Sequence, residues 1–323
     1  MRLVPAVAVL LLAPRAVAQE VTGDSPLPEG GSGVAARHPG DAGIARDPAV
    51  LFHDDFETVS TAADLAARWD AGVYHLHCVR IAMEPENRHA GGRALEFRVP
   101  RQPEELSNTV AKSLAVSQET LFLRYYTRFD GGFDHVGSSH NGATISARYF
   151  VDGAATPGVR ADGRNKFLAS FENWRGEAST KSPGGWAVYC YHPEQKDRFG
   201  DLFLPSGTVF PNSHERSGER TFGRGFVARP DRIPELGRWY CHEFMVRANA
   251  PGRRDGRIAC WIDGELIADY RNLRLRDAET LRIDRFSLDL HIGSNAIREN
   301  RKWYDDVVAA TSYVGPMAVG DAR

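Results

Sequence analysis

Apolar and polar side chains alternate with a period of two in short runs along most of the chain. Such alternation is typical of strands that bury one face of an antiparallel sheet. Between residues 258 and 268, two apolar runs flank Asp263-Gly264, a dipeptide that favours a two-residue hairpin turn. Further alternating runs occupy residues 94–99, 121–129, 186–191, 239–246 and 286–292. The pattern therefore predicts many short antiparallel strands.

Helical periodicity is scarce by comparison. The best candidate is residues 61–69, which begin with Thr61 in a position to cap a helix. Many short strands with few helices are typical of two sheets that pack against each other. The sequence therefore predicts an all-β fold, a two-sheet antiparallel β-sandwich of the jelly-roll type.

The N-terminus has a different pattern. Arg2 precedes an apolar run, residues 3–13, that is too short to cross a bilayer, and residues 16–18 have the small side chains of a cleavage site. We expect residues 1–18 to be a signal peptide. No later apolar run approaches the length of a membrane span, so we expect a secreted or periplasmic protein that is not inserted in a membrane.

The rest of the chain divides by composition. Residues 19–48 are rich in Gly, Pro, Ser and Ala without periodicity, which predicts a flexible linker. Residues 49–317 have the length of one β domain, and residues 318–323 form a short tail. With 40 basic and 42 acidic residues the net charge is −2, so we expect neither nucleic acid nor a membrane as a partner. We expect a monomer.

Four cysteines remain in the predicted mature chain. Exported proteins can oxidise cysteines, and four of them allow three pairings. Cys241 and Cys260 lie on successive predicted strands, so they are the first candidates for a disulfide. The alternative is that all four, Cys78, Cys190, Cys241 and Cys260, are buried free thiols.

Adjacent carboxylates mark two apolar strands that lie far apart in the sequence. Residues 51–57 (LFHDDFE) come near the start of the domain and residues 303–308 (WYDDVV) near its end, and we expect them to pair in one sheet. Calcium takes about six to eight oxygen ligands in irregular geometry. The pairing would therefore favour a structural Ca²⁺ held by Asp55, Glu57, Asp305 and Asp306. The alternative is that these carboxylates only keep edge strands solvated.

Aromatic and imidazole side chains mark a candidate binding surface. Tyr189 and Tyr191 are two residues apart on a predicted strand, so they share a face. With Trp186 nearby they are a plausible floor for a sugar-binding groove, and a half-buried aromatic face is the alternative. Residues 135–142 (HVGSSHNG) place two imidazoles and the amide of Asn141 among small residues that allow close approach to a ligand. An ordinary polar loop is the alternative there.

Other familiar chemistries lack their motifs. The chain has no HExxH, no paired CxxC, no GxSxG and no phosphate-binding loop. Zincins, zinc ribbons, α/β-hydrolases and nucleotide-binding proteins are therefore not supported.

Several runs between residues 120 and 316 are similar to one known family. Residues 123–134 (LRYYTRFDGGFD) are similar to the strand and turn that open its active-site sheet. Residues 239–256 contain its W…E…V…N-x-P-G…DG pattern, and the later runs WIDGE, HIGSN and WYDDVV continue the similarity. The family is the jelly-roll polysaccharide lyases of the alginate and glucuronan lyase type, which have a concanavalin A-like sandwich.

The resemblance implies β-elimination on a uronate-containing, acidic polysaccharide. That reaction needs a neutralised carboxylate, a base for the C5 proton and an acid for the departing O4. Tyr189 and Tyr191 match the family's Tyr-x-Tyr strand, and the resemblance implies that one of them is the base or the acid. The nearby candidates for lowering the tyrosine pKa and for binding the carboxylate are His140, Asn141, Arg148 and Lys166.

The chain departs from the family pattern at two places. It has residues 137–142 (GSSHNG) where such lyases often have Gly-Gly-Lys-Leu-Pro-Gly. It has Ser170-x-Glu172, where they often have Ser-x-Arg. A Glu172 carboxylate in the groove would repel a uronate, and it would suit a neutral sugar or act as a base.

Three functions are therefore compared. The first is a secreted polysaccharide lyase-like protein. The second is a non-catalytic carbohydrate-binding jelly roll with a structural calcium. The third is a glycoside hydrolase, which needs two facing carboxylates. Glu172 has no partner carboxylate two or four residues away, so the third is the weakest.

Overall fold

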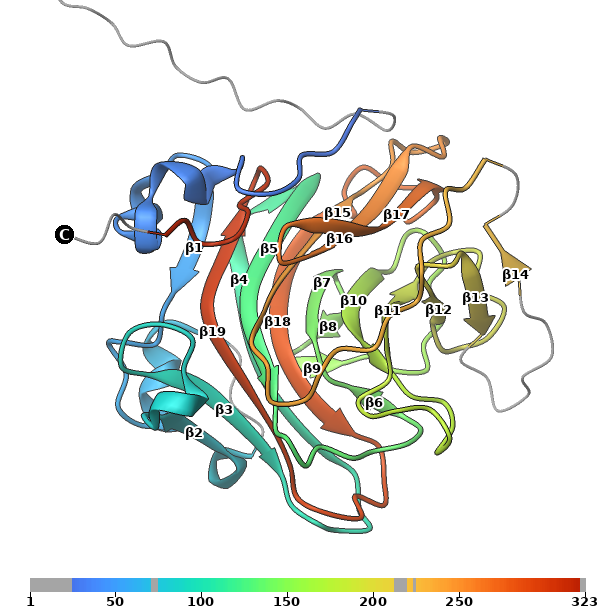
Figure 1. Ribbon diagram of the computed structural model, residues 1–323. Helices are drawn as coiled ribbons and strands as arrows, with labels where there is room; N and C mark the ends of the chain where they lie inside the picture. The colour runs from blue at the N-terminus through green and yellow to red at the C-terminus, as the bar shows by residue number, and fades with distance from the viewer. Residues whose placement is uncertain (1–24, 71–74, 212–219, 223–224, 320–323) are drawn as a thin grey trace, which may run out of the picture.

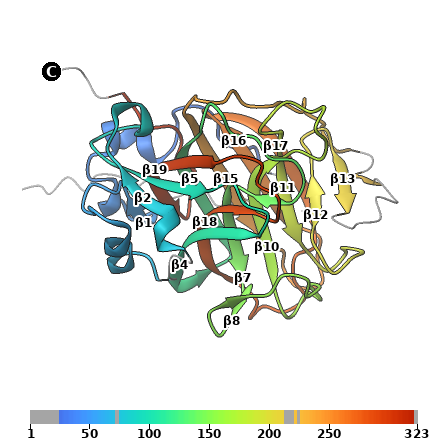
Figure 2. The ribbon, with the colours of Figure 1, turned by 90° about the horizontal axis from the view of Figure 1, so that it is seen from below.

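The protein is a sandwich of two antiparallel sheets. The computed structural model describes residues 25–70, 75–211, 220–222 and 225–319. Within these residues one sheet has eight strands and the other nine. Seen from below, β19, β5 and β15 lie in one layer and β18, β10 and β7 in the other (Figure 2). The predicted all-β jelly-roll sandwich is confirmed.

The eight-stranded sheet has the order β17-β16-β15-β5-β19-β3-β2, and β1 pairs with β19 beside that path. Its strands are β1 (Val50–Asp54), β2 (Val79–Ala82), β3 (Ala94–Val99), β5 (Thr120–Phe129), β15 (Tyr240–Arg247), β16 (Gly256–Ile262), β17 (Glu265–Leu273) and β19 (Asn300–Ala310).

The nine-stranded sheet has the order β14-β13-β12-β11-β10-β7-β18-β4, and β6 pairs with β18. Its strands are β4 (Leu106–Gln118), β6 (Ser139–His140), β7 (Ala143–Ala147), β10 (Phe167–Trp174), β11 (Gly185–Tyr191), β12 (Asp201–Phe203), β13 (Thr208–Pro211), β14 (Arg220–Thr221) and β18 (Ile283–Ile292).

Short elements connect the sheets. A separate hairpin consists of β8 (Phe150–Val151) and β9 (Ala154–Ala155). In the part of the chain that the structure describes, the helical segments are 3-10 turns: η1 (Val34–Arg37), η2 (Pro39–Asp41), η3 (Ile44–Arg46), η4 (Ala62–Ala67), η5 (Leu76–Cys78) and η6 (Pro85–Asn87). The helix expected at residues 61–69 is η4, and Thr61 caps it in a capping box with Asp64.

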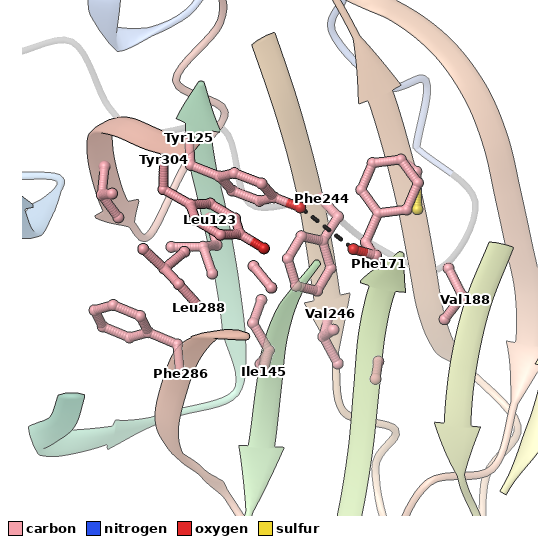
Figure 3. Packing of buried hydrophobic residues seen from close by; sticks show 14 of the residues in the cluster. Leu123, Tyr125, Ile145, Phe171, Val188, Phe244, Val246, Phe286, Leu288 and Tyr304 are labelled. Atoms are coloured by element: carbon pink, nitrogen blue, oxygen red, sulfur yellow. Dashed lines mark hydrogen bonds between the residues drawn. The ribbon is translucent and has the colours of Figure 1, made fainter. Parts of the chain in front are cut away.

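The main core lies between the two sheets. Alternate residues of each strand point inward, as the period of two requires, and Leu123, Phe244 and Tyr304 of one sheet meet Phe171 and Phe286 of the other (Figure 3). The Tyr125 hydroxyl donates to the carbonyl of Phe171 across the layers at 3.3 Å. The polar end of this buried ring is therefore satisfied by the opposite sheet.

The two acidic strands pair as expected. β1 and β19 are antiparallel neighbours, with His53 opposite Val308 and Asp54 opposite Val307. The Asp54 carboxylate accepts the indole N–H of Trp69 at 2.8 Å. The first and last strands of the domain therefore lie side by side in one sheet.

The flexible linker predicted for residues 19–48 is wrong for residues 25–48, which are folded against the eight-stranded sheet (Figure 1). Val34 and Ile44 are buried with Val308 and Val314. Backbone bonds join Val34 to Tyr313 and Ala35 to Val314. The physical reason is that apolar side chains such as Val308 lie on this face of the sheet, and residues 25–48 shield them from water. Residues 19–24 lie outside the described residues.

A buried ion pair fixes this cover. Asp41 in η2 contacts the guanidinium of Arg124 in β5, and the side chains are 4% and 0% exposed. The carboxylate raises the pKa of Arg124 against the opposing effect of burial. Arg124 therefore keeps its charge in the interior, provided that Asp41 stays in place.

The disulfide expected between Cys241 and Cys260 is wrong, since all four cysteines are buried free thiols. Cys260 lies opposite Phe244 on the neighbouring strand. Phe244 and Cys260 both belong to the core between the sheets. Cys241 is three residues from Phe244, so its side chain points to the other face of the same sheet.

The predicted signal peptide, residues 1–18, lies outside the described residues. Among the helices that the structure describes, none has the length and apolarity needed to cross a bilayer.

Asp41→Asn should lower the free energy of unfolding by about 3–5 kcal/mol, because it leaves the Arg124 charge buried without a partner. Urea denaturation of the purified protein measures this. The matched control is Arg37→Ala, which breaks an ion pair with Asp47 whose arginine is 53% exposed and should cost about 1 kcal/mol or less. Equal costs for the two variants would contradict a packed N-terminal segment.

Candidate functional site

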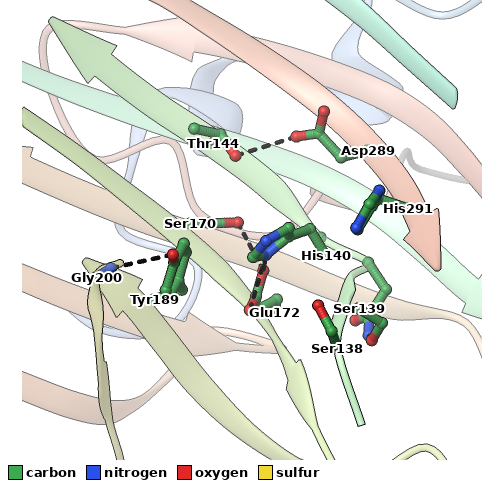
Figure 4. Close-up of polar contacts among 12 residues, drawn as sticks. Ser138, Ser139, His140, Thr144, Ser170, Glu172, Tyr189, Gly200, Asp289 and His291 are labelled. Atoms are coloured by element: carbon green, nitrogen blue, oxygen red, sulfur yellow. Dashed lines mark hydrogen bonds and ion pairs between the residues drawn. The ribbon is translucent and has the colours of Figure 1, made fainter. Parts of the chain in front are cut away.

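The outer face of the nine-stranded sheet carries a cluster of polar side chains (Figure 4). Residues that alternate with the core positions of β18, β10 and β11 point to this face. They include Asp289 and His291 of β18, Glu172 of β10 and Tyr189 of β11. His140 joins them from β6, where it lies directly opposite His291.

His140 and Glu172 form the central pair of this face. The ring Nδ1 of His140 lies 3.1 Å from one carboxylate oxygen of Glu172, and the Ser170 hydroxyl donates to the same oxygen at 3.0 Å. The His140 side chain is 34% exposed, whereas that of Glu172 is 2% exposed. The imidazole therefore lies at the surface of the site, and the carboxylate lies beneath it.

The pKa values of the two neighbouring imidazoles are shifted in opposite directions. Burial opposes the charge on His140, but the Glu172 carboxylate outweighs it and raises the pKa of His140 above 6.5. Burial, together with the electrostatic effects of His140 and His135, lowers the pKa of His291 to about 3. The His140 and His291 rings are stacked with centroids 5.3 Å apart. A proton on this pair therefore resides on His140.

Asp289 is a second carboxylate on the same face. It accepts hydroxyl groups from Thr109 at 2.8 Å, Ser287 at 2.8 Å and Thr144 at 3.0 Å. Burial raises its pKa despite these three bonds. Asp289 thus lies among hydroxyl groups rather than beside a base.

Tyr189 contacts the central pair from the other side. Its ring centroid lies 4.7 Å from that of His140, and its hydroxyl oxygen accepts the backbone N–H of Gly200 at 3.1 Å. Tyr191 points the same way, with its ring 5.5 Å from Tyr189. The structure therefore places His140 against both Glu172 and Tyr189, with Tyr191 next to Tyr189.

Tyr191 is set deeper than Tyr189. It is fully buried, and its hydroxyl accepts the N–H of Gly158 at 3.1 Å. Lys166 covers its ring, with Nζ 4.3 Å from the centroid, and also donates to Thr156. Burial lowers the pKa of Lys166 to about 8. The Lys166 ammonium group therefore lies over the Tyr191 ring and donates its hydrogen bond to Thr156.

The expected ligand-binding roles of Asn141 and Arg148 do not match their contacts. The Asn141 side chain accepts the N–H of Asn173 and donates to the carbonyl of the same residue, both at 2.9 Å, so it joins two segments of the protein. Arg148 follows the far end of β7 and donates to the carbonyl of Thr280 at 3.0 Å. Both side chains are therefore occupied by structural bonds.

A buried lysine supports the loop from below. Lys302 of β19 reaches through the core and donates to the carbonyl of Asn141, next to His140. It is 0% exposed, and burial lowers its pKa well below 10.5. The position of His140 is thus tied to the opposite sheet.

Trp186 does not lie on this face, contrary to the prediction that it joins Tyr189 and Tyr191. It points into the core, where its ring lies 5.8 Å from Tyr240 and 6.2 Å from His242 of the other sheet. Position 186 differs by an odd number from position 189, so Trp186 and Tyr189 lie on opposite faces. Trp174, two residues after Glu172, takes the outer face instead and packs against Phe210 at 5.1 Å.

The carboxylates predicted to bind calcium accept protein donors instead. Glu57 accepts the N–H groups of Gly92 and Arg93, and Asp305 accepts that of His89. Asp306 lies 2.7 Å from the ring Nδ1 of His89. In the described part of the chain no three His, Cys, Asp or Glu side chains are grouped to hold a metal.

This donor set does not fit a calcium clip. The Asp55 carboxylate also bonds locally, to the N–H of Glu57 at 3.2 Å. Burial, together with the neighbouring Asp306, raises the pKa of Asp305, which weakens it as an anionic ligand. Calcium binding at these residues is a prediction from the sequence that their contacts do not support.

Sequence reasoning missed His291 and Asp289. Both lie in the alternating run of residues 286–292, which was predicted as a strand with no role given to either side chain. The signal was present, because Ser287, Asp289 and His291 are three polar residues at alternate positions of one strand. Such a run marks a whole polar face rather than isolated side chains.

One cavity of the described residues lies away from this cluster. It has a volume of about 280 Å³ and lies against β12, β13 and β17, with Phe203, Phe222 and Leu273 in its wall. The arginines at its rim are paired with acids, such as Arg254 with Glu194. The described residues of this cavity therefore offer no chemistry comparable to that around His140.

Comparison with known proteins identifies relatives by fold alone. No protein-family model and no curated protein matches the chain. Among solved structures, alginate lyase Aly36B is 16% identical, with a TM-score of 0.59 over 83% of this chain and 99% of that lyase.

Two further alginate lyases are similar. vAL-1 from Chlorella virus is 13% identical, with a TM-score of 0.53 over 81% of this chain and 99% of that one. The marine PL-14 alginate lyase from Aplysia kurodai is 15% identical, with a TM-score of 0.52 over the same shares. The resemblance to jelly-roll polysaccharide lyases is confirmed at the level of the fold.

In a pH titration followed by NMR, the His140 ring should change charge above pH 6.5, whereas His291 should stay neutral down to about pH 3. Glu172→Gln should lower the His140 midpoint. Because the folded-state pKa of His140 is raised, its pair with Glu172 stabilises the fold fully below pH 6.5 and loses this effect as the pH rises through the raised value. Ser107→Ala, which removes only the hydroxyl partner of His291, is the control. An unchanged midpoint in Glu172→Gln would show that another group sets this pKa.

Proposed function

We propose that this chain is a secreted polysaccharide lyase-like protein that cleaves a uronate-containing polysaccharide by β-elimination. The observation that carries the proposal is the placement of His140 between the Glu172 carboxylate and the Tyr189 phenol on the outer face of the nine-stranded sheet. The fold shared with alginate lyases supports it, since one structure of Aly36B holds an alginate trisaccharide. Secretion rests on the sequence pattern of residues 1–18.

His140 is the proposed base. Its Nδ1 faces Glu172, which leaves Nε2 to accept the C5 proton of the uronate. The electron pair of the C5–H bond forms the C4=C5 double bond as the C4–O4 bond breaks. Glu172 stabilises the imidazolium that results, as a carboxylate does for a base that it orients.

Tyr189 is the proposed acid. Its hydroxyl proton passes to O4 as the glycosidic bond breaks, and the phenolate that remains accepts the N–H of Gly200. A hydrogen bond to the charged form favours that form. Proton return from the imidazolium to the phenolate, directly or through water, restores both groups, so that protons and electrons balance over the cycle.

Non-catalytic carbohydrate binding is the second candidate. Tyr189 is only 3% exposed, and its hydroxyl already accepts a backbone N–H, which favours a structural phenol. The same face would then bind sugars through hydroxyl, imidazole and aromatic groups without cleaving them. Cleavage separates the two candidates.

Absorbance near 235 nm should rise when the mature protein is mixed with its substrate, because elimination creates an unsaturated uronate. The panel contains alginate, glucuronan, heparosan and pectate, each in its acid and its esterified form. His140→Ala and Tyr189→Phe should lower the rate by about a hundredfold or more, since general acid–base catalysis contributes about 10²–10⁴-fold.

Tyr191→Phe is the matched control. Like Tyr189→Phe, it removes one tyrosine hydroxyl from this face of β11 together with that hydroxyl's hydrogen bond to a backbone N–H. Tyr191, however, is on the far side of Tyr189 from His140. It should retain most of the activity. A flat trace on the whole panel, with polymer binding detected by calorimetry, would favour the non-catalytic candidate.

Activity should also depend on pH through the base. His140 must be neutral to accept a proton, so kcat/KM should rise with pH through the raised pKa of His140. Glu172→Gln should move this rise to lower pH. A profile that falls over the same range would contradict His140 as the base.

A further inference from the structure

The charges around the proposed base are acidic. Glu172 lies 3.1 Å from the His140 ring, and the Glu105 carboxylate lies 3.7 Å from the neighbouring His291. Asp289 is on the same face, and its electrostatic effect reaches His140. Three carboxylates therefore surround two imidazoles, of which only His140 has a raised affinity for a proton.

Cations do not offset these carboxylates. Within the described residues, no Arg or Lys side chain forms an ion pair with Glu172 or Asp289. Lys302 acts on Glu172 from the core side, but its buried amine is shifted towards the neutral form and donates to the carbonyl of Asn141. Lys166 is occupied by Thr156 and the Tyr191 ring.

A free uronate carboxylate would meet this face unfavourably. β-Elimination removes the proton next to the carboxyl group, so a carboxylate would gain a second negative charge as the C5–H bond breaks. Such charge needs preorganised cationic or strong donor groups. When His140 acts as the base it is neutral at that moment, and the nearest charged group is Glu172.

An ester removes this requirement. Its carbonyl is uncharged before the reaction and takes up a single negative charge during it. The hydrogen-bonding groups on this face are chiefly hydroxyls, namely Ser107, Thr109, Thr144, Ser170 and Ser287. Four of these hydroxyls donate to Asp289 or Glu172, so their oxygens are left to accept from sugar hydroxyls. Carboxylates are bound most strongly by charged donors, which this set lacks.

We propose that the uronate bound beside His140 carries its carboxyl group as a neutral ester, so that the substrate class is an esterified uronate polysaccharide. This rests on the proposed function and narrows it. Glu172 thereby has two effects: it raises the basicity of His140 and it selects against an anionic sugar at the same position.

The test compares two forms of one polymer backbone. Initial rates at 235 nm and neutral pH are measured for alginate against propylene glycol alginate, and for polygalacturonate against highly methyl-esterified pectin. Blanks without protein correct for spontaneous elimination of the esters. The ester should react at least about tenfold faster, and mild saponification of the same sample should abolish the difference.

Ionic strength provides a second measurement that needs no variant. Repulsion between a carboxylate substrate and this face is screened by salt, so the slow reaction of the acid polymer should accelerate between 0.05 and about 0.5 M salt. The rate on the ester should change little. A rate on the acid polymer that falls with salt would indicate attraction and overturn the inference.

Glu172→Gln tests whether the Glu172 carboxylate causes the preference for the ester over the acid. It removes the charge at nearly constant shape, so the ratio of ester rate to acid rate should fall by about tenfold even if both rates decrease. Glu105→Gln is the graded comparison, because this carboxylate is 66% exposed and should change the ratio much less.

The outcomes separate the inference from the function on which it rests. Cleavage of the acid polymer at the same rate as the ester, or faster, overturns the ester inference and leaves the lyase in place. No unsaturated product from either form overturns the lyase, and the inference with it.

Discussion

The structure depends on one constraint: the eight-stranded sheet is buried on both faces. On one side it packs against the second sheet through residues such as Tyr125 and Phe244. On the other side it holds Arg124, which is acceptable in the interior because Asp41 reaches it from the N-terminal segment. Since residues from both chain ends cover that side, the outer face of the nine-stranded sheet is where polar side chains gather. The fold thus leaves this outer face as the one whose polar side chains a ligand can reach.

The sandwich was predictable from the sequence because alternation fixes which residues face inward. The pairing of the first and last strands followed from their shared acidic pattern. The folded state of residues 25–48 was not apparent, because their composition resembles a linker and 3-10 turns have no strong periodicity. A signal did exist in β5, where Phe122 and Tyr126 lie on the face that points away from the core between the sheets and so favour a cover on that side as well.

The site was predictable in part for the same reason. Tyr189 and Tyr191 could be assigned to one face from their spacing, and Glu172 stood out as an acid in an aromatic strand. The contact of Glu172 with His140 joins residues 32 positions apart, which periodicity cannot reveal. Trp186 was predicted on the same face as Tyr189, but the two positions are an odd number of residues apart, so Trp186 points into the core. The roles of Asn141 and Lys166 depended on backbone partners, which are fixed only by the folded loops.

The pairing of β1 with β19 has a kinetic consequence. Val50 lies opposite Ala310, so the sheet cannot close until nearly the whole domain is available. Contacts of such sequence separation carry a large loop-closure entropy and slow the search for the native state. A chain of this topology stays incompletely folded late into its synthesis, with the apolar edge of the sheet open to other proteins. That delay makes closure of the sheet depend on the final strand, β19.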